Sequence, residues 1–242
     1  MIRSDGRKID GLRKINIIPG GQIFAEGSVV INMGLTKVLC SVSVEEGVPQ
    51  FLKGLGKGWI TAEYGMLPRS TLTRNSRETV AKGIRGRTHE IQRLIGRSMR
   101  AAVNLELLGE RTLIIDCDVL QADGGTRTAS ITGAYVALYQ CLSKLLENKS
   151  LSKMPLKYAV SAVSVGWVDG EVILDLDYDE DHRADADFNI VLTDHGEFIE
   201  VQGTGEEISF PVQVLEQVLK LAELGGRQLF KIQNKAIESL SI

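Results

Sequence analysis

The first quarter of the chain alternates short runs of β-branched residues with glycines, which is typical of antiparallel strands. We expect strands at residues 15–18, 23–31, 37–44 and 59–64, with a glycine-rich loop between the last two. Residues 65–87 are polar, rich in arginine and without periodicity. The pattern therefore predicts a strand meander followed by a long exposed loop, and such loops usually carry function or move.

Helical spacing takes over in the middle of the chain. Apolar side chains recur every three to four positions over residues 91–103 and 128–146, so both segments are predicted helices. The apolar run at 111–120 predicts a strand between them, and residues 121–127 predict a turn. We therefore expect this region to run from helix to strand to turn to helix.

The last third of the chain returns to strands and then to helices. The predicted elements are strands at 158–168, 171–177, 188–193 and 197–202, an acidic loop at 178–187, and helices at 211–224 and 226–239. Asp169-Gly170 is a strong hairpin signal, and Gly225-Gly226 separates the two helices. Because strands precede helices twice, we predict an α+β fold with β-sheets packed against helices. Nothing in the sequence marks two independent cores, so we expect a single domain over residues 1–242.

The composition is that of an ordinary globular protein, but the charge is unevenly distributed. The 242 residues are 43% hydrophobic and 24% charged, which excludes disordered and collagen-like classes. The net charge of −3 conceals two blocks: residues 69–100 hold nine basic and two acidic residues, and residues 169–207 hold fourteen acidic residues and one arginine. Eight of the nine basic residues are arginines, which favours two-bond recognition of phosphate or carboxylate groups, although the blocks could instead neutralise each other within the fold or between subunits.

The cysteines and the apolar runs exclude several other classes of protein. Cys40, Cys117 and Cys141 lie in apolar runs without a spacing motif, so we expect buried free thiols rather than disulfides or a zinc site. No apolar run approaches the ~20 residues that a membrane-spanning helix needs. We therefore expect a soluble, cytoplasmic protein without a membrane partner.

Two turns at predicted helix starts could bind an anion. Asp123-Gly124-Gly125-Thr126-Arg127-Thr128 lies between a strand and a helix, and Gly86-Arg87-Thr88 opens the arginine-rich helix. Glycines let the backbone approach a ligand, and free N–H groups at a helix start attract negative charge. The two turns could converge on one oxyanion, although each could equally be a plain turn with a capping threonine.

The acidic loop is a candidate metal site. Residues 175–187 contain seven carboxylates, and carboxylates are the hard oxygen ligands that Mg²⁺ and Mn²⁺ prefer. A solvated acidic turn is an equally open interpretation. Taken together, the anion-binding turns, the arginine-rich segment and the carboxylates are the parts that phosphoryl transfer on a polyanion requires.

Several long motifs carry a resemblance to a known family. They are RSDGR at 3–7, AEGS at 25–28, GWITAEYGMLPR at 58–69, GRTHEIQRLIGR at 86–97, DCDVLQADGGTR at 116–127 and EVQGT at 200–204. In these motifs the chain resembles, nearly from end to end, the ribonuclease PH family of phosphate-dependent 3′→5′ exoribonucleases. One departure is Ala186-Asp187-Phe188, where the family more often has Val-Asp-Met, but the aspartate is kept.

The resemblance implies a fold of the ribosomal protein S5 domain 2-like kind and a phosphorolytic activity. Inorganic phosphate would remove 3′-terminal nucleotides of tRNA precursors and other RNA as nucleoside diphosphates, and the reverse reaction would add nucleotides. The residues implied for phosphate binding are Arg87, Gly125, Thr126 and Arg127. Asp181 and Asp187 are implied to hold Mg²⁺ or Mn²⁺, although one of them could instead protonate the leaving 3′ oxygen.

The resemblance also implies a homo-hexamer, built as a trimer of dimers. Arg69, Arg74 and Arg77 match arginines that the family uses for RNA binding or for contacts within its ring. We expect the same of Arg93 and Arg97, which share one face of the predicted helix. Two alternatives stay open: a non-catalytic RNA-binding ring subunit of an exosome-like assembly, and an exonuclease that uses water instead of phosphate.

Overall fold

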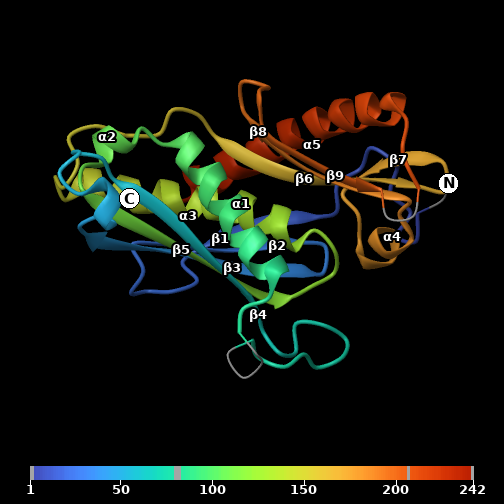
Figure 1. The fold of residues 1–242 in the computed structure, drawn as a ribbon, viewed down its shortest axis with the longest axis horizontal. Helices are drawn as coiled ribbons and strands as arrows, with labels where there is room; N and C mark the ends of the chain where they lie inside the picture. The colour runs from blue at the N-terminus through green and yellow to red at the C-terminus, as the bar shows by residue number, and fades with distance from the viewer. Residues whose placement is uncertain (1–2, 79–82, 206–207, 241–242) are drawn as a thin grey trace.

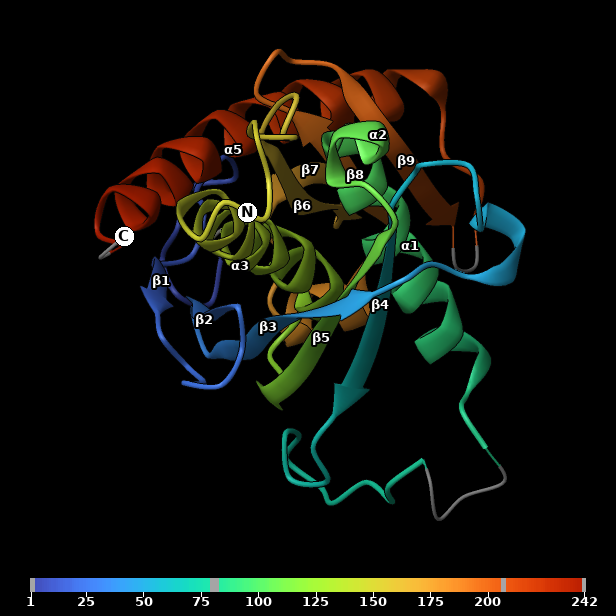
Figure 2. The same ribbon diagram turned by 90° about the vertical axis from the view of Figure 1, so that its left-hand side faces the viewer.

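Two β-sheets, with helices between and above them, form the fold (Figures 1 and 2). This computed structural model describes residues 3–78, 83–205 and 208–240. Lys82, Glu206 and Glu207, which belong to the two charge blocks, lie outside the described residues, as do positions 79–82 of the predicted long loop. The α+β class predicted from the sequence is confirmed.

The N-terminal half builds a five-stranded sheet in the order β1-β2-β3-β5-β4. Neighbouring strands are antiparallel except for β4 and β5, which are parallel. A parallel pair needs a crossover connection, and this one contains helix α1 followed by the short helix α2. The elements are β1 (Ile15–Pro19), β2 (Gly27–Met33), β3 (Thr36–Glu46), the 3-10 turn η1 (Gln50–Leu52), β4 (Trp59–Met66), α1 (Gly86–Ala102), α2 (Leu105–Leu108) and β5 (Arg111–Gln121).

The second strand begins later than the sequence pattern predicts. The Gly20 N–H donates to the Ser28 carbonyl at 2.7 Å, and this bond closes the β1–β2 hairpin. Ile23 and Phe24 lie in the loop that is left over and are 87% and 94% exposed. Their side chains are typical of strands, so the prediction of a strand from residue 23 was wrong because hairpin closure overrides local preference.

The C-terminal half builds a four-stranded antiparallel sheet in the order β7-β6-β8-β9. Its strands are β6 (Val160–Val168), β7 (Glu171–Leu174), β8 (Ala186–Thr193) and β9 (Phe198–Gly205). The predicted Asp169-Gly170 hairpin is confirmed, with positive φ at both residues as a tight hairpin turn requires. The predicted strand at 171–177 stops at Leu174, and the predicted acidic loop contains a short helix, α4 (Tyr178–Arg183).

Helix α3 (Thr126–Glu147) lies between the two sheets, as Figure 2 shows. It packs on β2 and β3 on one side and on β6 on the other, so it is buried on nearly every face. Val160 and Ala162 of β6 belong to the same apolar cluster as the side chains of α3. The main core therefore draws on both halves of the chain, and it holds the start of α3 in a fixed place.

Helix α5 (Val212–Glu238) covers the outer face of the second sheet and is continuous. The prediction of two helices split at Gly225-Gly226 was wrong. A Cβ at Gly225 would lie 2.9 Å from the Leu174 side chain, and one at Gly226 would lie 2.5 Å from that of Leu192. These glycines let the helix approach the sheet closely, so their role is packing and not helix termination.

Two exclusions from the sequence can be compared with the structure. Cys40, Cys117 and Cys141 are free and buried, as predicted. Among the described residues, no helix combines the length and the apolar character that crossing a membrane demands.

Candidate active site

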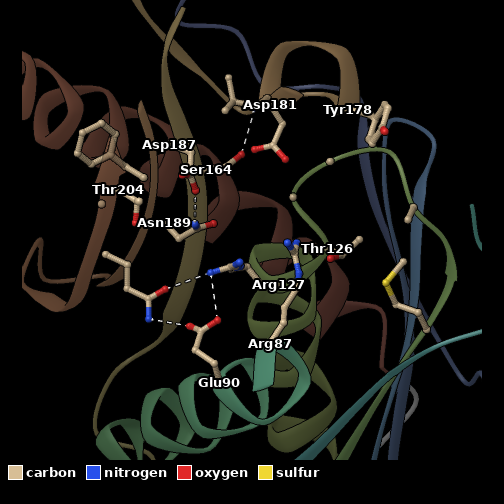
Figure 3. Close-up of a pocket in the computed structure, with 18 of the residues that line it drawn as sticks. Arg87, Glu90, Thr126, Arg127, Ser164, Tyr178, Asp181, Asp187, Asn189 and Thr204 are labelled. Atoms are coloured by element: carbon tan, nitrogen blue, oxygen red, sulfur yellow. Dashed lines mark hydrogen bonds and ion pairs between the residues drawn. The ribbon is translucent and has the colours of Figure 1, made fainter. Parts of the chain in front are cut away.

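A cavity of about 930 Å³ lies where the starts of α1 and α3 meet α4 and the strands β8 and β9 (Figure 3). Six predicted site residues line it together, from segments far apart in the sequence. They are Arg87, Gly125, Thr126, Arg127, Asp181 and Asp187. The two arginines lie on one side of the cavity and the two aspartates on the other (Figure 3). The cavity therefore has a basic wall and an acidic wall.

The basic wall is built on the glycine turn, residues 123–127, at the start of α3. Gly125 is the N-cap residue with φ +62°, and in the described structure no side chain caps this helix end. The N-terminal N–H groups of a 22-residue helix are therefore left for an anion. The Thr126 hydroxyl is 2.9 Å from the Tyr64 hydroxyl, a hydrogen bond that connects β4 to the turn.

The glycines of this turn are required mainly by the protein itself. Gly124 has φ +70°, and a Cβ there would lie 2.5 Å from the carbonyl oxygen of Leu176. A Cβ at Gly125 would lie 2.9 Å from the Arg13 guanidinium. The backbone of the turn thus packs directly against Leu176 and Arg13, and a side chain at either glycine would push these neighbours apart.

Arg127 is held by two partners that the sequence reasoning did not assign. Its Nη1 lies 3.5 Å from the Glu90 carboxylate and donates to the Gln202 side-chain carbonyl at 3.4 Å. Gln202 in turn donates to Glu90 at 3.0 Å. Both partners lie within the motifs at 86–97 and 200–204, so the signal was present, but only the fold shows that the motifs meet.

Arg87 is the second residue of α1 and is exposed. Its charge acts on the same group as that of Arg127, the buried hydroxyl of Tyr64. Burial raises the pKa of Tyr64, and the bond to Thr126 and the two arginine charges only partly oppose this. The hydroxyl therefore stays protonated at neutral pH and can act as a hydrogen-bond donor.

The acidic wall begins at α4. The Asp177 carboxylate accepts from the Glu180 N–H and the Glu180 carboxylate accepts from the Asp177 N–H, which is a capping box. Asp181 follows on this helix, and Asp187 lies at the start of β8 within 3.4 Å of the Asn189 amide. The D-x-x-E spacing predicts this helix start and was overlooked in the sequence.

The acidic wall suits a small hard cation bound by few protein ligands. Among the described residues, no group of three or more His, Cys, Asp or Glu side chains is arranged as a metal cage. Mg²⁺ commonly takes one or two carboxylates and completes its shell with water and substrate phosphate. Two carboxylates facing a basic wall that could hold a phosphate fit that requirement.

Two buried carboxylates of the acidic block, Glu180 and Asp175, pair with arginines near the N-terminus, which the distribution of charge along the sequence did not predict. Arg3 is buried and makes a two-bond contact with the Glu180 carboxylate, at 2.7 and 2.6 Å. Arg13 makes a similar contact with Asp175, at 3.1 and 2.7 Å. Between the two charge blocks, the ion pair found in the described residues joins Arg97 to Glu200 at 2.6 Å. Within the fold, the described residues therefore show little mutual neutralisation of the two blocks.

Two family models match nearly the whole chain in succession. The model for domain 1 of the 3′ exoribonuclease family matches residues 11–142, and the model for domain 2 matches residues 158–224. The chain belongs to the 3′ exoribonuclease family. Proteins named ribonuclease PH from strains of Dehalococcoides mccartyi are 58% identical over 233 or 234 residues, covering 96–97% of this chain and 97–98% of theirs.

Solved structures of other proteins share the fold. An Archaeoglobus fulgidus exosome chain, from a structure with RNA bound to the active site, superposes with a TM-score of 0.81 at 23% identity, covering 95% of this chain and 91% of that one. Rice Rrp46 superposes with a TM-score of 0.80 at 18% identity, covering 98% and 100%. At these identities the likeness concerns the fold, and it agrees with the fold expected from the resemblance.

The five arginines predicted for RNA binding or ring contacts lie outside the cavity. Arg69, Arg74 and Arg77 are exposed on the loop between β4 and α1. Arg93 is exposed on α1, and Arg97 makes its ion pair with Glu200. The structure therefore separates these side chains from the residues predicted to hold phosphate and metal, and the roles of both sets stay predictions.

Proposed function

We propose that this protein is a phosphorolytic 3′→5′ exoribonuclease that trims tRNA precursors and other RNA. The observation that carries the proposal is the single cavity in which Arg87, Thr126 and Arg127 face Asp181 and Asp187. This pairing of an anion site with carboxylates occurs in a chain 58% identical to proteins named ribonuclease PH over nearly its full length. Its proposed location is the cytoplasm.

The basic wall holds the attacking phosphate. An oxygen of inorganic phosphate attacks the phosphorus of the last phosphodiester, and the bond from that phosphorus to the 3′ oxygen of the preceding nucleotide breaks. A proton reaches this 3′ oxygen, and a nucleoside diphosphate leaves. Arg87 and Arg127 offset the repulsion between two phosphates, while the Thr126 hydroxyl and the helix N–H groups fix the orientation of the nucleophile.

The acidic wall acts at the leaving oxygen. Asp181 and Asp187 would hold Mg²⁺, or Mn²⁺, which supplies Lewis-acid stabilisation of the developing charge. The Asn189 amide donates to Asp187 and orients its carboxylate, and one of the two aspartates could instead deliver the proton to the leaving oxygen. Because one phosphoric ester or anhydride bond replaces another, excess nucleoside diphosphate should drive extension of the RNA 3′ end.

The proposal includes a homo-hexamer, arranged as a trimer of dimers, with RNA reaching the cavity along exposed arginines. Arg69, Arg74 and Arg77 on the loop after β4 are placed to contact RNA or a neighbouring subunit, as is Arg93. A sizing measurement with light scattering tests this part. A monomer at working concentration would contradict it.

The decisive experiment is trimming of a tRNA precursor with and without inorganic phosphate, with the released nucleotides identified. We expect diphosphates, formed only when phosphate is present. Phosphate-independent release of monophosphates would instead show a hydrolase. RNA binding without any release would show a non-catalytic ring subunit.

A further inference from the structure

The glycine turn is held by Arg13, a side chain outside the cavity lining. Arg13, which precedes β1, is 6% exposed. Its Nη1 donates to the carbonyl of Asp123, and its Nη2 approaches the carbonyl of Gly124 at 3.5 Å. Arg13 is not among the described residues that line the cavity, so it engages these two carbonyls from outside the lining. In a trans peptide the N–H that follows each carbonyl points in the opposite direction, so Arg13 fixes the orientation of the Gly124 and Gly125 N–H groups.

Asp175 holds Arg13 in this orientation. It is fully buried and accepts from the Arg13 backbone N–H at 2.7 Å, from Nε at 3.1 Å and from Nη2 at 2.7 Å. Its backbone adopts φ +57°, a conformation that aspartate tolerates better than most residues. Burial alone would lower the pKa of Arg13, but the charge and hydrogen bonds of Asp175 raise it. Arg13 therefore remains a cation beneath the turn.

Thr36 fastens the same turn from a second direction. Its buried hydroxyl donates to the Gly124 carbonyl at 2.7 Å and accepts from the Asp123 N–H at 2.9 Å. The Asp123 carboxylate also accepts from the Tyr178 N–H at the start of α4, at 3.4 Å. Arg13 and Thr36 thus hold the turn that includes Asp123, and the Asp123–Tyr178 bond joins this turn to α4, the helix that carries Asp181.

We propose that Arg13 and Asp175 are positioning residues that set the glycine turn for phosphate, an inference that rests on the proposed function. A buried ion pair contributes little net stability in general. The geometry of this one is specific, because a single guanidinium meets a carboxylate and two peptide carbonyls at once. Lysine carries the same charge but lacks the planar, branched guanidinium, so it cannot contact the carboxylate and both carbonyls at once.

The test compares Arg13→Lys and Thr36→Val with a matched control, Gln233→Leu. Gln233 is also fully buried and also donates to two backbone carbonyls, those of Thr132 and Val160, each at 2.9 Å, but it lies on α5 away from the turn. Three quantities are measured: the KM for phosphate in RNA trimming, the Kd for RNA, and the rise in Tm that phosphate produces without RNA.

We expect Arg13→Lys to raise the phosphate KM on the order of tenfold, since small misplacements of a binding group have effects of this size or larger. Thr36→Val, which leaves the charges intact, should change it in the same direction by about threefold, roughly the effect of one modest hydrogen bond. Both should leave the RNA Kd within twofold, and Gln233→Leu should lower Tm without changing the phosphate KM. Equal changes in the phosphate KM of Arg13→Lys, Thr36→Val and Gln233→Leu would overturn the inference.

The Tm measurement separates this inference from the proposed function. If the wild-type protein releases monophosphates without phosphate, the proposed function fails, yet the phosphate-induced rise in Tm still reports on the turn. A rise in the wild type that Arg13→Lys loses would support positioning. An equal rise in both proteins, or no rise in the wild type, would overturn it. If Arg13→Lys does not fold, Thr36→Val decides by the same criteria.

Discussion

The starts of α1 and α3 combine the same residue types but are supported in different ways. Each places glycine, threonine and arginine at the beginning of a long helix that faces the cavity. The glycine turn at α3 is fastened by Arg13, Thr36 and Tyr64, all buried. At α1 the corresponding bond joins Thr88 to Glu78, on the polar loop that precedes the helix, at 2.7 Å.

The difference indicates that two similar motifs can contribute to anion binding in different ways. Groups that neighbouring side chains hold in place bind an anion with less further ordering, whereas an exposed side chain without such contacts must lose more conformational freedom when it binds. Arg127 at α3 is fixed by Glu90 and Gln202. Arg87 at α1 is exposed. We expect the α3 start to set the phosphate geometry and the α1 start to add adaptable charge.

The largest expected effect is that of Arg127→Ala. Phosphorolysis should fall by about 100- to 1,000-fold, because a fixed charge at the attacking phosphate is lost. Initial rates of trimming at saturating RNA measure the loss, and RNA binding, measured by filter retention, should change little. Parallel losses in both measurements would assign Arg127 to RNA anchoring and break the comparison.

The lysine variants test the division of labour directly. Arg127→Lys should lower kcat/KM for phosphate on the order of 50-fold, because lysine cannot reproduce a fork held by Glu90 and Gln202. Arg87→Lys, at an exposed position, should lower it by about fivefold. The comparison depends on the order of the two effects, and the reverse order would mean that the start of α1 sets the geometry.

Tyr64→Phe should have a moderate effect through Thr126. Removing the 2.9 Å hydroxyl contact takes away one hydrogen bond of about 1 kcal/mol. We therefore expect the phosphate KM to rise about fivefold while kcat stays near its original value. The measurement is the trimming rate as a function of phosphate concentration. Tyr158→Phe is the control, because the ring of Tyr158 lies beside that of His195 and takes no part in the Tyr64–Thr126 contact.

Thr88→Val should have the smallest effect. It removes the bond to Glu78 but leaves the α1 backbone and Arg87 in place. We expect kcat/KM for phosphate to stay within about twofold and the free energy of unfolding to fall by about 1 kcal/mol. Denaturant unfolding and phosphate titration check the two parts. A loss of activity as large as that of Thr36→Val would show that both helix starts need the same support.

Much of the fold could be predicted from the chain because the signals are local. Period-two and period-3.6 patterns indicated most strands and helices, and Asp169-Gly170 indicated the hairpin between β6 and β7. The errors occurred where tertiary packing overrides local preference. Ile23 and Phe24 have side chains typical of strands but lie in the loop of the β1–β2 hairpin. Gly225-Gly226 resembles a helix end but instead lets α5 pack closely against the sheet.

The candidate site, like the fold, could be predicted only in part from the sequence. The motifs and the family resemblance named Arg87, Arg127, Asp181 and Asp187, and all four line one cavity. Glu90, Gln202 and Arg13 were missed, although Glu90 and Gln202 lie within named motifs, and Asp175 was included only as one carboxylate of the candidate metal site. Their importance depends on contacts between segments up to 162 residues apart, as for Arg13 and Asp175, and no local pattern reports such contacts.

The sequence by itself determined the order of the elements, the family and the residue types available for phosphate and metal, since these follow from periodicity and from contiguous motifs. Only the tertiary structure decided which charges meet. The net charge concealed a basic and an acidic block, and their distribution suggested mutual neutralisation or outside partners. The fold instead pairs the acidic segment with Arg3 and Arg13 from the N-terminus. The physical reason is burial: a carboxylate removed from water needs a charged partner, and the fold places Arg3 and Arg13 beside these carboxylates.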